Sequence, residues 1–163
     1  MVQKKQNLSD YDPNHIPKLK NAKVAVVVSE WNTEVTFALR DGAIDTLKKH
    51  GVAEDDIVLK YVPGSFELPI AAEMILLNNQ EIEGVICLGC VIQGETRHFD
   101  FICDATSNGV MNVAINNATP VIFGVLTTND MQQALDRSGG KHGNKGVEAA
   151  VACLKMIALD RSL

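Results

Sequence analysis

The chain has 163 residues, 46% of them apolar, which suits a single domain with one sizeable core. Its formal net charge of -5 argues against general nucleic-acid binding, because phosphate backbones are bound by clustered cationic side chains. No apolar segment reaches the roughly 18 residues of a membrane span. The opening MVQKK is polar where a secretory signal would become apolar, so we expect a cytoplasmic protein.

An N-terminal arm or disordered tail is predicted for residues 1–20, ahead of a single domain over residues 21–163. The first 20 residues are polar, and Pro13 and Pro17 interrupt any helix there. The regular patterns of strands and helices begin after this stretch.

Four apolar segments are predicted strands, and each is followed by a helical pattern. The predicted strands cover residues 24–28, 57–62, 85–92 and 120–126. Asn32 and Ser65 are the predicted N-caps of the first two helices, and further helices are expected over about 98–117, 131–136 and 147–158. This order predicts a three-layer α/β/α sandwich that resembles flavodoxin, with a four-stranded parallel sheet.

Cys87 and Cys90 form a CxxC pattern, which is found in metal and redox sites. Both lie in a predicted strand, where residues three apart point to opposite faces. No second CxxC is present to complete a zinc site. We therefore interpret both as buried thiols that pack as small hydrophobes.

Three polar segments directly follow predicted strands, where ligands of parallel α/β proteins bind. After the first strand, Trp31 is placed to stack on a flat heteroaromatic ring or to pack in the core, and Asn32 to cap a helix. After the second, the helix start at 63–67 offers backbone amides, and Glu67 either accepts hydrogen bonds from a polyol or simply complements the helix dipole.

The third segment, residues 94–98, is the most informative. Gly94 permits close backbone approach, and Thr96 with the nearby amides can hold phosphate oxygens. His98 carries an imidazole that can transfer protons near neutral pH, unless it is merely structural or exposed. This combination suits an anionic, phosphorylated substrate.

A fourth segment, residues 137–146, is rich in glycine and basic residues. Arg137 suits a bidentate phosphate contact, whereas the alternative is a flexible surface loop. The segment is not a Walker A motif, because no strand precedes it and no GK[ST] follows. With no metal cluster or convincing nucleophile in the sequence, the predicted chemistry is acid–base and electrostatic.

Five segments occur in order across residues 24–146: VVVSEWN, VPGSFELP, LGCVIQGETRHFD, PVIFGVLTT and ALDRSGGKHGNKG. Together they resemble the 6,7-dimethyl-8-ribityllumazine synthase family over nearly the whole chain after residue 20. The resemblance implies a transferase of riboflavin biosynthesis without a cofactor. It would condense 5-amino-6-(D-ribitylamino)uracil with 3,4-dihydroxy-2-butanone 4-phosphate and release phosphate and water.

The resemblance also implies a role for each matching residue. His98 matches the proton-transfer histidine, and Trp31 the aromatic residue that stacks on the pyrimidine. Glu95 and Thr96 match the site of the butanone phosphate, where Arg137 grips the phosphate. The remaining implied binding residues contact the ribityl chain, read the pyrimidine edge or complete the site: Asn32, Gly64, Ser65, Phe66, Glu67, Val91, Ile92, Phe123 and Lys145.

Family resemblance further implies a homopentamer, with Phe123 and Arg137 reaching the site of an adjacent subunit. The short, glycine-rich 137–145 segment favours assembly of pentamers into an icosahedral 60-mer, and the arm is expected to add a strand to a neighbour's sheet. Two departures are mild. Trp31 stands where phenylalanine is more usual, and Glu95, where many members have a small residue, is expected to point away from the phosphate.

Three alternatives remain at the level of sequence. The first is a flavodoxin-like module that binds a flavin without turnover. The second is a shell protein with a vestigial site. The third is the archaeal type of riboflavin synthase, which would take the lumazine itself as substrate. The presence of His98, Arg137 and Lys145 together favours the condensing enzyme.

Overall fold

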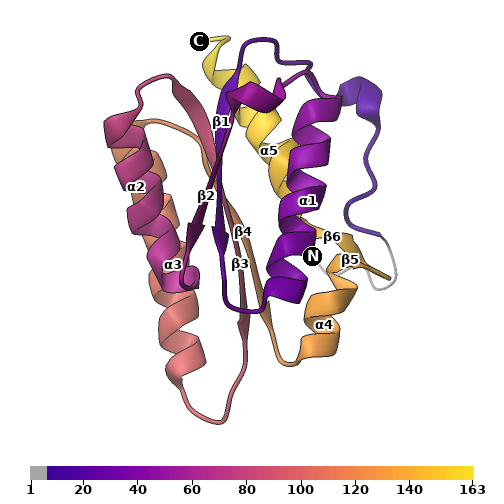
Figure 1. Ribbon diagram of the computed structural model, residues 1–163, viewed down its shortest axis with the longest axis vertical. Helices are drawn as coiled ribbons and strands as arrows, with labels where there is room; N and C mark the ends of the chain where they lie inside the picture. Colours follow the sequence, from indigo (N-terminus) through magenta and orange to yellow (C-terminus); the bar gives the residue numbers. More distant parts are fainter. Residues whose placement is uncertain (1–6) are drawn as a thin grey trace.

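The computed structural model describes residues 7–163, and the first six residues of the predicted arm lie outside this range. Four strands form a single parallel sheet in the order β2-β1-β3-β4. These are β1 (Lys23–Ser29), β2 (Ile57–Val62), β3 (Ile82–Ile92) and β4 (Val121–Thr128). Helices cover both faces, which confirms the predicted three-layer α/β/α sandwich (Figure 1).

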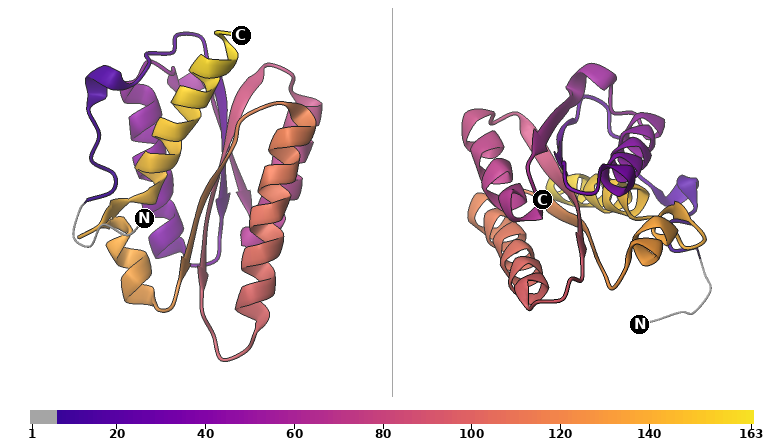
Figure 2. Two further views of the ribbon diagram at one scale, coloured as in Figure 1. Left: turned by 180° about the vertical axis from the view of Figure 1, so that it is seen from behind. Right: turned by 60° about the horizontal axis from the view of Figure 1, so that its bottom comes forward.

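Two helices cover one face of the sheet, and two long helices and a short one lie on the other (Figures 1 and 2). The first face carries α2 (Leu68–Asn78) and α3 (His98–Asn117). The second carries α1 (Thr33–Lys49), α4 (Met131–Asp136) and α5 (Lys145–Asp160). Within the described residues, no helix is both long and apolar enough to cross a membrane.

Alternation along β1 builds the two halves of the core. Val24, Val26 and Val28 pack with α1 and α5, whereas Ala25 and Val27 pack with α2 and α3. All five side chains are fully buried. A strand covered on both faces buries every residue, which explains why the sequence shows a continuous apolar run instead of alternation.

The two cysteines of the CxxC pattern lie in β3 on opposite faces of the sheet, as predicted. Cys87 belongs to the core on the α2 and α3 face, and Cys90 to the core on the α1 and α5 face. Burial raises the pKa of the Cys87 thiol to about 12 and that of Cys90 to about 11. Both therefore stay protonated and unreactive at neutral pH.

The glycine-rich segment after α4 is an ordered hairpin and not a flexible loop. It pairs β5 (Ser138–Gly140) with β6 (Gly143–Asn144) in antiparallel fashion, and α5 starts directly after it. This hairpin was not predicted, because three glycines in a short segment carry no strand signal.

The described part of the arm, residues 7–20, packs on its own domain beside α1 (Figure 1). Ile16 and Leu19 are buried in the core, and Pro13–His15 form a 3-10 turn. The Tyr11 hydroxyl lies 3.1 Å from Nε2 of His50, and the Lys49 ammonium lies 5.6 Å from the centre of the Tyr11 ring. Addition of an arm strand to a neighbour's sheet stays a prediction.

Acidification is expected to weaken this contact between arm and domain. His50 is 2% exposed, and burial, with smaller contributions from Lys49 and Lys18, lowers its pKa from 6.5. A group whose folded pKa is lowered stabilises the fold above its unfolded pKa, and the stabilisation is lost as the pH falls from 6.5 through the lowered value. Thermal unfolding at pH 7.5 and pH 5 should therefore show a drop of a few degrees, part of which is absent in His50→Phe.

The exposed His15 supplies the control for this measurement, because His15→Gln removes another histidine of the arm without touching the buried contact. A His50→Phe variant with the same dependence of Tm on pH as the wild type would contradict the role of His50.

Candidate functional site

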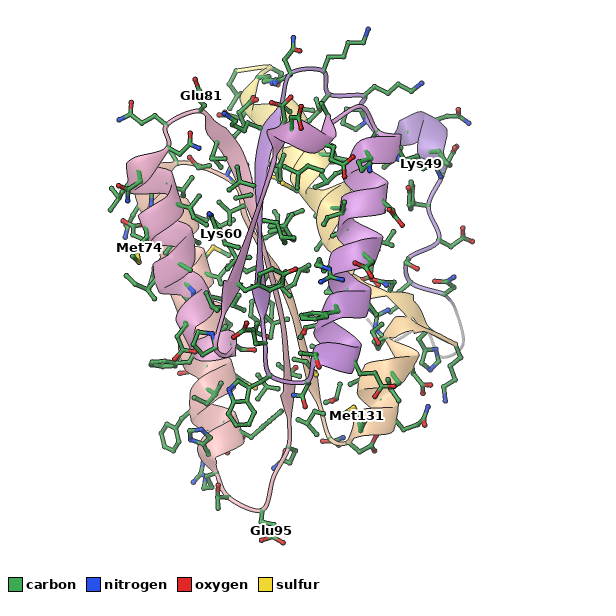
Figure 3. All side chains as sticks on the ribbon, in the orientation of Figure 1. Lys49, Lys60, Met74, Glu81, Glu95 and Met131 are labelled. Carbon is green, nitrogen blue, oxygen red and sulfur yellow. The ribbon has the colours of Figure 1, made fainter. Side chains whose placement is uncertain are left out.

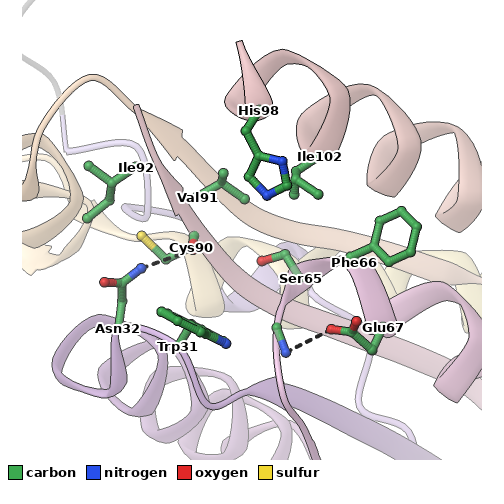
Figure 4. Close-up of a pocket in the computed structure, with 11 residues that line it drawn as sticks. Trp31, Asn32, Ser65, Phe66, Glu67, Cys90, Val91, Ile92, His98 and Ile102 are labelled. Atoms are coloured by element: carbon green, nitrogen blue, oxygen red, sulfur yellow. Dashed lines mark hydrogen bonds between the residues drawn. The ribbon is translucent and has the colours of Figure 1, made fainter. Parts of the chain in front are cut away.

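A pocket of about 700 Å³ opens at the carboxyl end of the sheet. Because β1, β2 and β3 are adjacent and parallel, the segments that follow them meet at this edge. Figure 4 shows the side chains converging from these segments and from the start of α3. The pocket is lined by Trp31, Asn32, Gly64, Ser65, Phe66, Glu67, Cys90, Val91, Ile92, His98 and Ile102.

Trp31 presents its indole to the pocket instead of packing in the core. Trp31 is 70% exposed, and its backbone N–H donates to the carbonyl of Pro63 at 3.2 Å. This bond extends the pairing of β1 and β2 past their ends and holds the indole beside the 63–67 turn. An exposed aromatic face in a pocket can stack on a planar ring.

The prediction that Asn32 caps α1 with its side chain is wrong. Asn32 adopts a left-handed conformation, with φ of 60°, and its side-chain amide donates to the carbonyl of Cys90 at 3.2 Å. The Cys90 carbonyl lies past the end of the pairing between β1 and β3, where β1 supplies no donor. The Asn32 amide supplies one instead. Asn32 therefore ties the first pocket segment to the third (Figure 4).

The prediction that Ser65 caps α2 is also wrong. Residues 65–67 form a 3-10 turn, α2 begins at Leu68, and Glu67 accepts the N–H of Gly64 at 3.0 Å. Ser65 is buried against β3, where Gly89 leaves room for its hydroxyl because a Cβ there would overlap that oxygen. Among residues 7–163 the Ser65 hydroxyl is buried without a hydrogen-bond partner.

Glu67 uses one carboxylate oxygen, Oε2, to close this turn. Within the described residues, Oε1 makes no hydrogen bond and can accept from a ligand hydroxyl. Phe66, 56% exposed, forms the adjacent apolar wall between Ser65 and the start of α3.

His98 is the first residue of α3 and is exposed at the mouth of the pocket. Its backbone N–H donates to the Thr96 hydroxyl at 3.4 Å, which shapes the turn into the helix. Its imidazole lies over the pocket between Val91 and Ile102, where it can exchange protons with a bound molecule (Figure 4).

Two of the predicted site residues, Glu95 and Thr96, lie in the exposed loop between β3 and α3. The Glu95 side chain extends from the tip of this loop into solvent (Figure 3), and its orientation relative to a bound phosphate stays a prediction. Phe123 lies half-buried in β4, packed against the core on the α2 and α3 face. None of the three lines the pocket within the described part of the chain.

The two basic residues predicted for the site, Arg137 and Lys145, lie away from the pocket of their own chain. Arg137 donates from Nη2 to Glu148 at 2.6 Å and from Nη1 to the carbonyl of His142 at 2.6 Å. Lys145 donates to the other oxygen of Glu148 at 3.3 Å. Figure 1 shows β5 and β6 beside α1 and the arm, on the other side of the sheet from α3. One carboxylate thus holds both cations in a partly buried group.

The family of this chain is decided by its similarity to known proteins. The sequence model of the family described as 6,7-dimethyl-8-ribityllumazine synthase matches residues 21–161. The chain belongs to the 6,7-dimethyl-8-ribityllumazine synthase family. The match covers every strand of the sheet and every segment of the pocket.

Curated relatives named 6,7-dimethyl-8-ribityllumazine synthase match this chain over nearly their whole length. The 6,7-dimethyl-8-ribityllumazine synthase of Porphyromonas gingivalis is 50% identical over 155 residues, which cover 95% of this chain and 96% of that protein. That of Cytophaga hutchinsonii is 52% identical over 153 residues, covering 94% and 95%. That of Parabacteroides distasonis is 48% identical over 152 residues, covering 93% and 94%.

Two of the lining residues, Cys90 and Ile102, were not predicted from the sequence. Ile102 follows His98 by four residues, a spacing that places both on one face of α3 and could have revealed it. Cys90 holds Asn32 through its backbone carbonyl, and backbone groups leave no trace in a side-chain pattern.

Proposed function

We propose that this chain condenses 5-amino-6-(D-ribitylamino)uracil with 3,4-dihydroxy-2-butanone 4-phosphate to 6,7-dimethyl-8-ribityllumazine, with loss of phosphate and water. Membership of the lumazine synthase family supports this proposal. The observation that carries it is that three groups meet in one pocket: the exposed indole of Trp31, the Glu67 carboxylate, which has one oxygen free of hydrogen bonds within the described residues, and the imidazole of His98. These groups suit a planar ring, a polyol and a proton transfer, respectively.

The pocket divides into regions that fit the pyrimidine substrate. The Trp31 indole stacks on the ring, while the backbone of Val91 and Ile92 at the end of β3 reads its polar edge. The ribityl chain lies along the turn between β2 and α2. Its hydroxyls meet Oε1 of Glu67, and Asn32, Gly64, Ser65 and Phe66 line the surrounding wall.

The reaction needs no protein nucleophile, because the amine of the pyrimidine substrate attacks the ketone of the other. Holding the two reactants together supplies much of the rate gain. His98 transfers protons as the carbinolamine loses water and as phosphate leaves. Its place at the pocket mouth, beside the exposed loop of Glu95 and Thr96, supports this role.

A second subunit completes the phosphate region of the site. In one chain the β5–β6 hairpin, which Arg137 and Lys145 flank, lies across the sheet from α3, and this supports a role for both residues in the pocket of an adjacent copy. Phe123 is proposed to reach that same pocket from β4. Apolar side chains that are 56–70% exposed along α2, α3 and the 65–67 turn support a homo-oligomer, because a monomer would leave them in water. They are Phe66, Ile70, Met74, Leu77, Phe101, Met111 and Ile115.

The assembly proposed is a pentamer, further organised into an icosahedral 60-mer. The short 137–145 hairpin supports the closed shell, because it leaves no bulky insertion beside α5. The location proposed is the cytoplasm, and the four free cysteines fit its reducing environment.

The proposed reaction is tested with purified protein and both substrates, followed by lumazine absorbance or fluorescence. Product is expected only when both substrates are present, without added metal or nucleotide. Folded, oligomeric protein that forms no product would contradict the proposal. A bound yellow flavin would then favour a binding module, and a colourless assembly would favour a structural shell.

Complementation between variants tests the shared site. Subunits carrying His98→Ala are co-expressed with subunits carrying Arg137→Ala, and activity is assayed with the butanone phosphate well below the raised KM of Arg137→Ala, where each variant is weak alone. If adjacent copies build each site, mixed assemblies regain activity, because about one site in four then holds both wild-type residues. Co-expression of two copies of the His98→Ala subunit is the control. Mixed assemblies that are no more active than the parent variants would exclude a shared site.

A further inference from the structure

The N-terminal arm holds the hairpin that carries Arg137 and Lys145 at its two ends. The backbone N–H of Leu8 donates to the carbonyl of His142 at 3.3 Å. The backbone N–H of Asn144 donates to the Ser9 hydroxyl at 3.0 Å. The arm thus contacts both the turn and the second strand of the hairpin, 135 residues away in the sequence.

The Ser9 hydroxyl is held in one orientation. It donates to Oδ1 of Asn7 at 2.8 Å, and the Ser9 backbone N–H donates to the same oxygen at 3.0 Å. Because its proton is directed at Asn7, the oxygen lone pairs are free to accept the N–H of Asn144. The hydroxyl therefore acts as a fixed acceptor for the hairpin.

Asn144 links this acceptor to the domain. Its Oδ1 accepts the N–H groups of Gly146 and Val147 at the start of α5, at 2.8 and 3.3 Å. Its Nδ2 donates to the carbonyl of Ala38 on α1 at 2.9 Å. The Asn144 side chain is thus bonded to both α1 and α5. The hydrogen bond to Ser9 also fixes the backbone N–H of Asn144, which directly precedes Lys145.

The arm also reaches Arg137 through one shared atom. The carbonyl of His142 accepts both the Leu8 N–H and Nη1 of Arg137, the latter at 2.6 Å. Across the hairpin, the N–H of Lys145 donates to the carbonyl of Arg137 at 2.8 Å. A shift of the arm therefore moves the group that orients the guanidinium.

Gly143 allows the arm to lie directly on the hairpin backbone. Its φ is +86°, and a Cβ at this position would overlap the side chains of Asn7 and Ser9. The residue type at 143 is thus matched to both the turn and the arm above it.

We propose that Ser9 is a positioning residue for the phosphate site. Its hydroxyl, oriented by Asn7, holds the hairpin so that Arg137 and Lys145 are presented to the phosphorylated substrate. The proposal rests on the proposed role of Arg137 in binding phosphate. It extends that role by making the arm of one subunit part of the support for an adjacent pocket.

The test compares Ser9→Ala, Ser9→Thr and the arm control His15→Ala in the full-length protein. Ser9→Ala is expected to raise the KM for the butanone phosphate about three- to tenfold, the effect of one hydrogen bond. The KM for the pyrimidine substrate and kcat should change little. Ser9→Thr keeps the hydroxyl and should restore the wild-type KM, and His15→Ala should match the wild type.

Inhibition by inorganic phosphate supplies a second readout, and its inhibition constant should rise in Ser9→Ala by the same factor. Equal losses for both substrates, or failure of Ser9→Thr to rescue, would reduce Ser9 to a structural role and overturn the proposal. If the KM for the butanone phosphate is unchanged in Ser9→Ala but raised in Arg137→Ala, the role of Ser9 is refuted and that of Arg137 stands. An unchanged KM in both would instead refute the phosphate role of Arg137.

Discussion

His98→Ala is expected to lower kcat by roughly two to four orders of magnitude, the usual contribution of a positioned acid–base group. The affinity for the pyrimidine substrate should stay within about threefold of wild type, because a group acting only in proton transfer contributes little to ground-state binding. The imidazole lies at the pocket mouth, apart from the Trp31 and Glu67 walls that hold this substrate. Steady-state kinetics and equilibrium binding of the pyrimidine substrate measure the two quantities separately.

His98→Gln is the matched variant, since glutamine keeps hydrogen-bonding capacity but does not titrate near neutral pH. It should be nearly as slow as His98→Ala. If His98 only bound substrate, glutamine would restore activity, and kcat and affinity would fall together in the alanine variant. Either result would remove His98 from proton transfer.

Arg137→Ala is expected to raise the KM for the butanone phosphate about 10- to 100-fold, with kcat changed only a few-fold. Hydrogen bonds to a charged group contribute about 1.5–3 kcal/mol, which corresponds to this range. The KM for the pyrimidine substrate should not change. Kinetics with each substrate varied in turn measure the difference, and an unchanged KM for the phosphate substrate would exclude Arg137 from its site.

Two further variants separate phosphate binding from loss of structure. Removing Arg137 leaves the partly buried Glu148 with Lys145 alone, so Tm is measured beside the kinetics. Arg137→Lys keeps the charge but loses the fork that contacts Glu148 and His142 together, and it should give an intermediate KM. Glu148→Gln keeps Arg137 but loosens its anchor, so a raised KM there would show that orientation, and not charge alone, matters.

Local patterns predicted the strands and helices because their causes are local. A buried parallel strand needs an apolar side chain at each position, and β1 has one from Val24 to Val28. The opposite faces of Cys87 and Cys90 followed from strand alternation alone. The meeting of three polar segments in one pocket followed from the rule that parallel strands end at the same edge.

The errors arose where a side chain had two possible partners. Asn32 and Ser65 are good N-caps by residue type, yet Asn32 binds the Cys90 carbonyl and Ser65 is buried against Gly89. In each case the competing partner lies on another strand. Capping preference is a local tendency of about 1 kcal/mol, and a partner supplied by the tertiary fold can override it.

The sequence by itself determined the alternation of strands and helices, the parallel sheet and the residues available for chemistry, because apolar periodicity and residue type are properties of the chain. Only the tertiary structure decided which of those residues meet. Packing α3 and the β5–β6 hairpin on opposite sides of the sheet separates His98 from Arg137, and folding the arm back places Ser9 on Asn144. Contacts between segments that distant depend on the packing of the whole domain, so no local pattern encodes them.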